Sequence, residues 1–138
     1  MSNLVRLSFS IERDLHQRLE KLVASSGYTN RSEFIRDLVR DRLVDRQWQS
    51  DEETIGTITI IYDHHKSNVA AKLTKLQHSI HNSVLASTHV HLDEKLCAEV
   101  IIVRARAKRI RKLTDTLRRQ KGILHAVLTT SSTGEDLG

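Results

Sequence analysis

Residues 84–103 read VLASTHVHLDEKLCAEVIIV. The pattern predicts two strands, Val84–Leu92 and Leu96–Val103, because both runs are rich in β-branched and other apolar residues. Asp93-Glu94-Lys95 between them is polar and short. We therefore expect the two strands to pair as an antiparallel hairpin.

The segments on either side of this hairpin extend the pattern symmetrically. The predicted elements are, in chain order, a strand at Thr57–Tyr62, a helix at His65–His81, the hairpin, a helix at Arg106–Arg119 and a strand at Ile123–Thr130. The order β-α-β-β-α-β is that of the ferredoxin-like split βαβ fold. Lys121-Gly122 ends the second helix, and Ser131–Gly138 is expected to be a frayed tail.

The first 50 residues predict a smaller βαα unit. Apolar and polar residues alternate strictly from Val5 to Ile11, which indicates a half-buried strand. A helix then runs from Glu12 to Ser26 and stops at Gly27, and a second helix begins with the capping-box-like Asn30-Arg31-Ser32-Glu33 and fades near Trp48. A unit of this size has too little core to be stable alone, so we expect it to dimerise.

The polar segment Ser50–Thr54 is the predicted linker between the two units. We therefore expect an N-terminal domain over residues 1–50 and a C-terminal domain over residues 54–138. The predicted fold class is α+β.

The charge of the 138-residue chain is unevenly distributed. The net charge is +5, made up of +2 over residues 1–50, −3 over residues 51–103 and +6 over residues 104–138. An acidic middle rich in histidine, between two basic ends, suggests a cation bound centrally and a polyanion nearby. Cys97 is the single cysteine, which excludes a disulfide framework within the chain, and no apolar run approaches the roughly 18 residues that cross a bilayer. We expect a cytoplasmic protein with no membrane partner.

The polar side of the N-terminal strand carries Arg6, Ser8 and Ser10. In a dimer the two strands would form an antiparallel ribbon that fits the major groove of DNA, where arginine reads guanine and hydroxyls read either kind of base edge. Asn30-Arg31-Ser32 would offer the backbone N–H groups of a helix start to a phosphate. From the strand alone, an ordinary exposed strand face is the alternative, but the whole arrangement resembles ribbon-helix-helix repressors.

The hairpin carries a candidate metal site. His89 and His91 are two residues apart on one strand and leave the same face, and Cys97 lies across the short loop. Two imidazoles and a thiolate make a plausible three-point cation site. His78 lies roughly 160° from the apolar stripe of the preceding helix, so it is either solvated or directed at another subunit. His81 lies between the direction of His78 and the apolar stripe and could be either. We expect structural or ancillary roles for His64, His65 and His125.

Taken together, the motifs resemble the bacterial and archaeal nickel-responsive transcriptional regulators, from Arg6 to about Thr130. The blocks that carry the resemblance are Gly27-Tyr28-Thr29-Asn30-Arg31-Ser32-Glu33 with Ile35-Arg36-Asp37, Gln77-His78, and His89-Val90-His91 with Cys97. In that family a ribbon-helix-helix dimer is joined to ferredoxin-like (ACT-like) domains that form a tetramer, a dimer of dimers.

The resemblance implies one Ni(II) per subunit at the tetramer interface, with His89, His91 and Cys97 as ligands from one subunit and the equivalent of His78 from a neighbour. Three imidazoles and a thiolate in a square plane suit Ni(II), although Cu(II) shares this preference. The implied function is repression of nickel uptake or nickel-related genes by metal-dependent binding to an inverted-repeat operator.

The resemblance also implies supporting residues. The implied positions are Tyr62, Gln77 and Glu99 beside the ligand imidazoles, Glu33 and Asp37 at a potassium site between the domains, and Arg6, Ser8 and Ser10 as base readers. The chain departs from the family at Arg104-Ala105 and His125-Ala126, where Lys-Gly and His-Gly are expected, and His78-Ser79-Ile80-His81 lacks the run of histidines that some members carry.

Three other functions are alternatives to a nickel-responsive regulator. A ribbon-helix-helix regulator could respond to another transition metal or to a small organic effector, but the organic effector would not need the His and Cys set. An architectural or toxin-neutralising DNA binder would not need a second folded domain. A metalloenzyme would need a general base beside an open metal position, which this set does not offer, so we expect no enzymatic activity.

Overall fold

The computed structural model describes residues 3–66, 68–80 and 82–138. Its contacts divide the chain into two compact units, Met1–Asp41 and Arg42–Gly138. None of the helices in the described part of the chain has the length and apolar character needed to cross a membrane.

The first unit contains helix α1 (Arg13–Ser25) and the start of helix α2 (Arg31–Gln49). Gly27 follows α1 with a φ of 76°, a left-handed conformation that glycine adopts without strain, and so ends the helix as predicted. The Asn30 side chain caps α2, because its Oδ1 accepts a hydrogen bond from the Glu33 N–H at 3.0 Å. Glu33 does not complete a reciprocal capping box; its carboxylate instead accepts a hydrogen bond from Thr29 Oγ1 at 3.4 Å.

The strand predicted at residues 5–11 does not form within this single chain. The segment has no regular secondary structure, and Val5, Leu7 and Phe9 are 80%, 83% and 65% exposed. A strand needs a partner that satisfies its backbone N–H and C=O groups, and no other strand in the described part of this unit supplies one. Val23 and Phe34 are the buried hydrophobic residues described in this unit. The first unit therefore has the small core that the sequence predicted.

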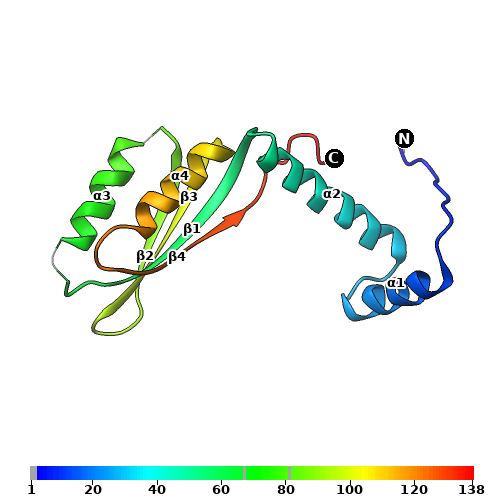
Figure 1. The fold of residues 1–138 in the computed structure, drawn as a ribbon, viewed down its shortest axis with the longest axis horizontal. Coiled ribbons are helices and arrows are strands. Elements are labelled where there is room, and N and C mark those ends of the chain that lie inside the picture. The colour runs from blue at the N-terminus through cyan, green and yellow to red at the C-terminus, as the bar shows by residue number, and fades with distance from the viewer. Residues whose placement is uncertain (1–2, 67, 81) are drawn as a thin grey trace. The chain divides into compact units, whose positions relative to one another are not determined.

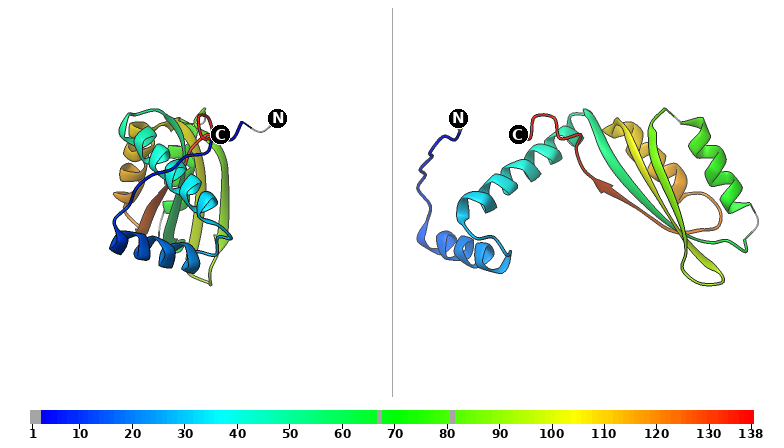
Figure 2. Two further views of the ribbon diagram at one scale, coloured as in Figure 1. Left: turned by 90° about the vertical axis from the view of Figure 1, so that its right-hand side faces the viewer. Right: turned by 180° about the vertical axis from the view of Figure 1, so that it is seen from behind.

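The second unit contains a four-stranded antiparallel sheet with two helices on one face (Figures 1 and 2). Its elements are β1 (Glu53–Asp63), α3 (Val69–Ser79), β2 (Val84–His91), β3 (Leu96–Arg106), α4 (Ala107–Arg118) and β4 (Ile123–Thr130). The strand order β2-β3-β1-β4 confirms the predicted ferredoxin-like topology. The central strands β1 and β3 are longer than predicted and pair from Glu53 opposite Arg106 to Asp63 opposite Leu96.

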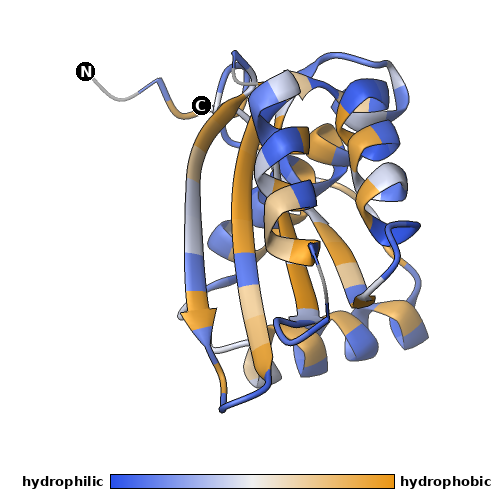
Figure 3. Ribbon diagram, turned by 90° about the vertical axis from the view of Figure 1, so that its left-hand side faces the viewer, coloured by the Kyte–Doolittle hydropathy of each residue, from blue (hydrophilic) through white to orange (hydrophobic). Residues whose placement is uncertain are grey.

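The core of the second unit lies between the sheet and its helices. Alternate residues of β1 and β3 face the helices, so Ile58 and Ile60 lie opposite Ile101 and Glu99. The strands in Figure 3 are coloured mainly as hydrophobic, whereas the helices alternate hydrophobic and hydrophilic turns. The fully buried members of this core include Ile58, Ile60, Tyr62, Leu73, Cys97, Ile101, Ile110 and Leu117.

The C-terminal segment is packed against this unit rather than frayed, so the prediction for Ser131–Gly138 is wrong. The Ser131 N–H donates a hydrogen bond to the Ile55 carbonyl at 2.8 Å. The Ser131 carbonyl accepts one from the Trp48 indole N–H at 2.7 Å. Gln47 Nε2 donates to the Glu135 carbonyl at 3.3 Å. Local sequence patterns do not reveal these contacts, because they join residues more than seventy positions apart.

Trp48 is 4% exposed in the core of the second unit, and the Arg111 guanidinium lies over its ring at 5.2 Å. Trp48→Ala should lower the free energy of unfolding by about 3–5 kcal/mol, because it leaves a large cavity. Trp48→Phe is the matched control, and should lose mainly the hydrogen bond to Ser131, about 1 kcal/mol. Urea denaturation followed by circular dichroism at fixed protein concentration measures both values. An Ala variant as stable as the Phe variant would contradict this role.

Candidate metal centre

The turn of the β2–β3 hairpin sets the position of the candidate ligands. Asp93 Oδ1 accepts hydrogen bonds from the backbone N–H groups of Lys95 at 2.8 Å and Leu96 at 2.7 Å, and these bonds lower the pKa of the Asp93 carboxyl. With the turn fixed in this way, the pairing register places His91 directly opposite Cys97 and His89 opposite Glu99. Residues opposite each other in an antiparallel pair share one face of the sheet. The hairpin therefore brings His91 and Cys97 together, as predicted.

Two imidazoles contact the thiol. Cys97 Sγ lies 3.3 Å from His91 Nδ1 and 3.3 Å from His64 Nδ1. The three donor atoms all lie within 4.8 Å of one another, and we refer to His64, His91 and Cys97 as the His–Cys cluster. Burial raises the pKa of the Cys97 thiol, and the nearby carboxylates of Asp93 and Asp63 raise it further. A metal that binds the thiolate would therefore displace a proton.

His64 belongs to the cluster, whereas the sequence predicts a structural or ancillary role for it. It follows directly after β1, and its backbone N–H donates a hydrogen bond to the Lys95 carbonyl in the hairpin turn at 3.0 Å. Asp63 Oδ1 accepts the next N–H, that of His65, at 2.9 Å. The strand register could have identified His64. Asp63 at the end of β1 lies opposite Leu96, so the next residue, His64, is placed near Cys97.

His89 lies beside the cluster but is not part of it. Its ring centre is 4.9 Å from that of His91, and its Nε2 lies 3.3 Å from the Tyr62 hydroxyl. Burial raises the pKa of Tyr62, as do the nearby Glu99 carboxylate and Cys97, so the hydroxyl keeps its proton as a possible hydrogen-bond donor. The contact agrees with a role for Tyr62 in orienting a ligand imidazole, which stays a prediction.

Gln77 and Glu99 contact each other. Gln77 Nε2 donates a hydrogen bond to Glu99 Oε1 at 2.8 Å, and Ser87 Oγ lies 3.0 Å from the same oxygen. His78 is the next residue along α3 and is exposed, beside a cleft that Gln77, Ser87 and Glu99 also line. Among the described residues, His78 is not in the His–Cys cluster. His81 lies outside the described residues.

The donor chemistry of this region fits a transition metal. A thiolate and neutral imidazoles are ligands for Ni(II), Cu(II), Co(II) and Zn(II), whereas Mg²⁺ and Ca²⁺ prefer oxygen. Cys97 is 0% exposed, so its sulfur is shielded from bulk water and held by the strand on which it lies. The residues that would hold the metal are Cys97, His91 and an imidazole next to them, either His64 or His89.

The residues predicted to contact DNA all lie in the first unit. Arg6, Ser8 and Ser10 are exposed in the irregular segment before α1. Asn30 caps α2, as described above, and Ser32 in the first turn of α2 is exposed. Arg31 Nε forms an ion pair with Glu20 Oε1 at 3.2 Å, which joins the start of α2 to α1.

The two carboxylates of the predicted potassium site lie one turn apart on α2. Asp37 accepts a hydrogen bond from the Tyr28 hydroxyl and one from Arg40 Nη1 at 3.1 Å. The bond from Tyr28 lowers the pKa of Asp37, with Arg40 and Arg36 contributing. Glu33 lies 4.0 Å from Arg36 Nη2. Each carboxylate thus lies beside an arginine of its own helix.

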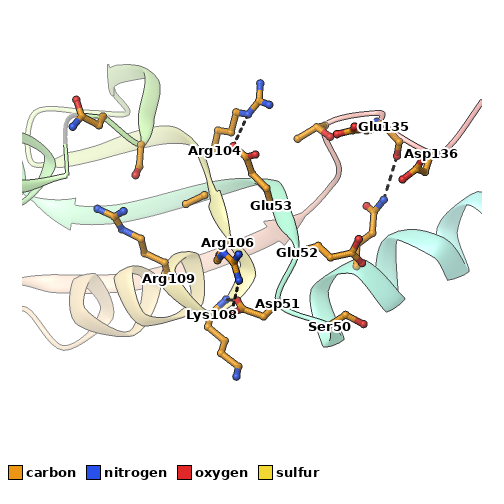
Figure 4. Close-up of a pocket in the computed structure, with 15 residues that line it drawn as sticks. Ser50, Asp51, Glu52, Glu53, Arg104, Arg106, Lys108, Arg109, Glu135 and Asp136 are labelled. Atoms are coloured by element: carbon orange, nitrogen blue, oxygen red, sulfur yellow. Dashed lines mark hydrogen bonds and ion pairs between the residues drawn. The ribbon is translucent and has the colours of Figure 1, made fainter.

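A cavity lies away from the His–Cys cluster, where β1 begins (Figure 4). Two of its arginines form ion pairs: Arg104 Nε lies 2.9 Å from Glu53 Oε1, and Arg106 Nη1 lies 4.0 Å from Asp51 Oδ2. Ten positions of β1 separate Glu53 from Asp63 at the cluster end. Arg104 at the sequence departure noted above therefore serves an ion pair, and this cavity does not contain the candidate ligands.

Comparison with protein families identifies both parts of the chain. Residues 55–131 match the family described as the NikR C terminal nickel binding domain, and residues 5–46 match the family described as ribbon-helix-helix protein, copG family. Among solved structures, an uncharacterized protein from Thermotoga maritima aligns with 57% of this chain and 98% of its own, at a TM-score of 0.52 and 14% identity. That likeness shows the fold alone.

Curated relatives match nearly the whole chain. A protein from Solibacter usitatus named "Putative nickel-responsive regulator" is 45% identical over 138 residues, 99% of both chains. A protein of the same name from Pyrococcus furiosus is 46% identical over 135 residues, 97% of this chain and 98% of its own. The chain therefore belongs to the family of nickel-responsive regulators, with a ribbon-helix-helix DNA-binding domain followed by a NikR-type nickel-binding domain.

Proposed function

We propose that the chain is a homotetrameric nickel sensor that binds an inverted-repeat operator in its nickel-loaded form and represses genes of nickel uptake or use. The observation that carries this proposal is the contact of the buried Cys97 sulfur with imidazole nitrogens, on a chain that also has a DNA-binding domain. A regulator of chromosomal genes would act in the cytoplasm. The proposed domains are residues 1–50 and 54–138.

The proposed nickel site uses His89, His91 and Cys97 of one subunit and the equivalent of His78 from a neighbour, with one Ni(II) per subunit. Support comes from the contact between His91 and Cys97, the ring of His89 next to His91, and the exposed position of His78 on α3. A bound Ni(II) ion would link two subunits, because this d⁸ ion favours a square plane of such donors.

His64 and His89 are alternative candidates for the third ligand beside His91 and Cys97. In this chain His64 contacts the Cys97 sulfur, while His89 contacts Tyr62. We propose that His64 contacts the thiol when nickel is absent and that His89 replaces it in the four-ligand site. The two imidazoles lie on different elements, so single variants separate them.

Nickel titration of three single variants tests this ligand set. Cys97→Ala should abolish the thiolate-to-nickel charge-transfer absorption, and His89→Ala should weaken nickel binding by tenfold or more. His64→Ala is the matched control and should keep about one nickel per chain. Circular dichroism checks that each variant is folded. Loss of nickel from His64→Ala with retention by His89→Ala would exchange their roles, and an unchanged absorption band in folded Cys97→Ala would refute the site.

Mixing two variants tests whether His78 acts in a neighbouring subunit. His78→Ala and Cys97→Ala should each lack complete sites as pure proteins. When the two are unfolded together and refolded, mixed tetramers should regain part of the charge-transfer absorption, because an intact His78 then meets an intact Cys97 in another subunit. Mixing His91→Ala with Cys97→Ala is the control and should restore nothing, since both residues belong to one subunit's half of the site. Equal recovery in both mixtures, or none in either, would contradict the shared site.

Coupling between metal and DNA requires two arrangements of the DNA-binding dimers. Nickel can favour operator binding only if it binds one arrangement more tightly, and the operator must then tighten nickel binding by the same factor. We propose that Glu33 and Asp37 hold a potassium ion that stabilises the DNA-competent arrangement. Their spacing of one turn on α2 supports a shared cation. Arg6, Ser8 and Ser10 would read the bases and Asn30, Arg31 and Ser32 would contact phosphate.

Carboxylate variants of α2 test the proposed potassium site. Glu33→Ala and Asp37→Ala should weaken nickel-dependent operator binding, because the cation loses a ligand, while nickel stoichiometry stays near one per chain. Asp41→Ala removes an equal charge from an exposed position of the same helix and should bind operator like the wild type. Operator affinity is measured across a potassium series at constant ionic strength. Loss of nickel from either variant, or wild-type affinity at every potassium concentration, would refute the site.

Two alternatives of the same general kind have their own tests. Cu(II) favours the same donors and binds more tightly in the order of divalent metals, so one competition assay with Ni, Cu, Co and Zn identifies the preferred metal. A small organic effector would need a pocket, and the apolar cavity between α3 and α4, lined by Leu76, Ile80, Val103 and Leu113, measures about 270 Å³. That volume is below the usual range of ligand pockets, and the cavity of Figure 4 is lined mainly by charged and polar residues instead of apolar ones. Both observations favour the metal.

A further inference from the structure

The outer face of α4 carries an excess of positive charge that the proposed nickel and operator sites do not use. Between Ala107 and Lys121 the chain has seven basic residues and one acidic residue, Asp115. We infer that this face is a second contact for DNA, which binds the phosphate backbone without regard to sequence. The inference rests on the proposed DNA-binding function and extends it from the first unit to the metal-binding domain.

The position of the charges on the helix is the first argument. Lys108, Lys112 and Arg119 are exposed and follow one another at helical spacing, and we call them the α4 ridge. Lys108 extends away from the strands at the start of α4 (Figure 4). The ridge is about 16 Å long at 1.5 Å per residue, and one DNA strand has a phosphate for about each 3.4 Å of axis. Its length therefore matches several consecutive phosphates.

The charges of the ridge are not neutralised within the described part of the protein. No carboxylate of the described residues lies within 4.0 Å of the Lys108, Lys112 or Arg119 side-chain nitrogens, whereas Asp115 pairs with Arg118 at 3.6 Å. The Asp51 carboxylate near the start of α4 accepts a hydrogen bond from the Lys108 backbone N–H at 2.9 Å. Asp51 thus caps a backbone N–H at the start of the helix and does not pair with the Lys108 side chain.

A role in helix stability does not explain the first half of the ridge. Cations stabilise the C-terminal end of a helix, which accounts for Arg118 and Arg119, but they oppose the dipole near the N-terminal end. Lys108 and Lys112 are in the first half, the first turn contains no acidic residue, and a like-charged pair four residues apart repels. A polyanion lying along the ridge would relieve this repulsion.

The opposite face of α4 indicates whether the partner of the α4 ridge is DNA or a membrane surface. A basic amphipathic helix binds a membrane by inserting its apolar face among the lipids. The apolar face of α4 is already used, because Ile110 and Leu117 are 0% exposed and Leu113 is 8% exposed against the sheet. The ridge can offer charge to a partner but no apolar surface. Charge without apolar surface is what contact with a phosphate backbone requires.

The test compares two double variants that remove the same charge. Lys108→Gln/Lys112→Gln changes the ridge, and Lys72→Gln/Lys75→Gln changes two exposed lysines of α3. Binding of the nickel-loaded full chain to a long duplex of random sequence is measured across a salt series. Each lost phosphate contact reduces the slope of log affinity against log salt by about 0.9, so the ridge variant should lose about 1.8 and bind on the order of tenfold more weakly or worse. The α3 control should keep the wild-type slope.

Thermal unfolding of the free protein adds a readout that a structural role would not give. The ridge variant should unfold at or above the wild-type temperature, because it removes like-charge repulsion while it weakens DNA binding. If wild type binds random DNA and the ridge variant keeps the control's slope, the inference is wrong while the proposed function stands. If wild type binds no DNA at any salt, the proposed function fails as well. If wild type binds vesicles of phosphatidylserine and phosphatidylcholine and only that binding is lost in the ridge variant, the partner is a membrane and the inference is overturned.

Discussion

The pairing of β1 with β3 is the interaction on which the rest of the second domain depends. The two strands pair without a break from Glu53 opposite Arg106 to Asp63 opposite Leu96. A shift of one residue would turn every side chain of a strand to the other face. In the observed register Ile58 and Ile101 point into the core together, and Tyr62 lies opposite Cys97. The same ladder therefore supports both the core and the candidate metal centre.

The candidate metal centre lies at the end of the core, next to backbone hydrogen bonds of the hairpin turn. The Asp93 turn fixes the hairpin, and the hydrogen bond of His64 to Lys95 ties the end of β1 to that turn. Cys97 is buried, so its thiol has a raised pKa and its sulfur is held in place by the strand. Such a site favours a partner that accepts a thiolate in apolar surroundings, which is the chemistry of a transition metal. At the other end of β1, charged side chains pair with each other instead.

The two domains obtain their stability in different ways. The second has a continuous core closed by Trp48 from α2 and by the C-terminal segment. The first leaves Leu7, Phe9 and Leu22 largely exposed. Exposed apolar side chains on this scale favour association with a second surface of the same kind, which supports the proposed assembly of subunits.

The sequence by itself determined the order of elements in the second domain, the helix boundaries at Gly27 and Asn30, and the contact of His91 with Cys97, because each depends on residues close in the chain. Sequence patterns did not predict the contacts that depend on distant residues. His64 reaches Cys97 only through the β1–β3 register, and Trp48 holds Ser131 across 83 positions. The expected N-terminal strand does not form in this chain, because no strand in the described part of its unit supplies a hydrogen-bonding partner. Local sequence decides which elements form, whereas tertiary structure decides which of their side chains meet, because meeting depends on long-range pairing that no short pattern encodes.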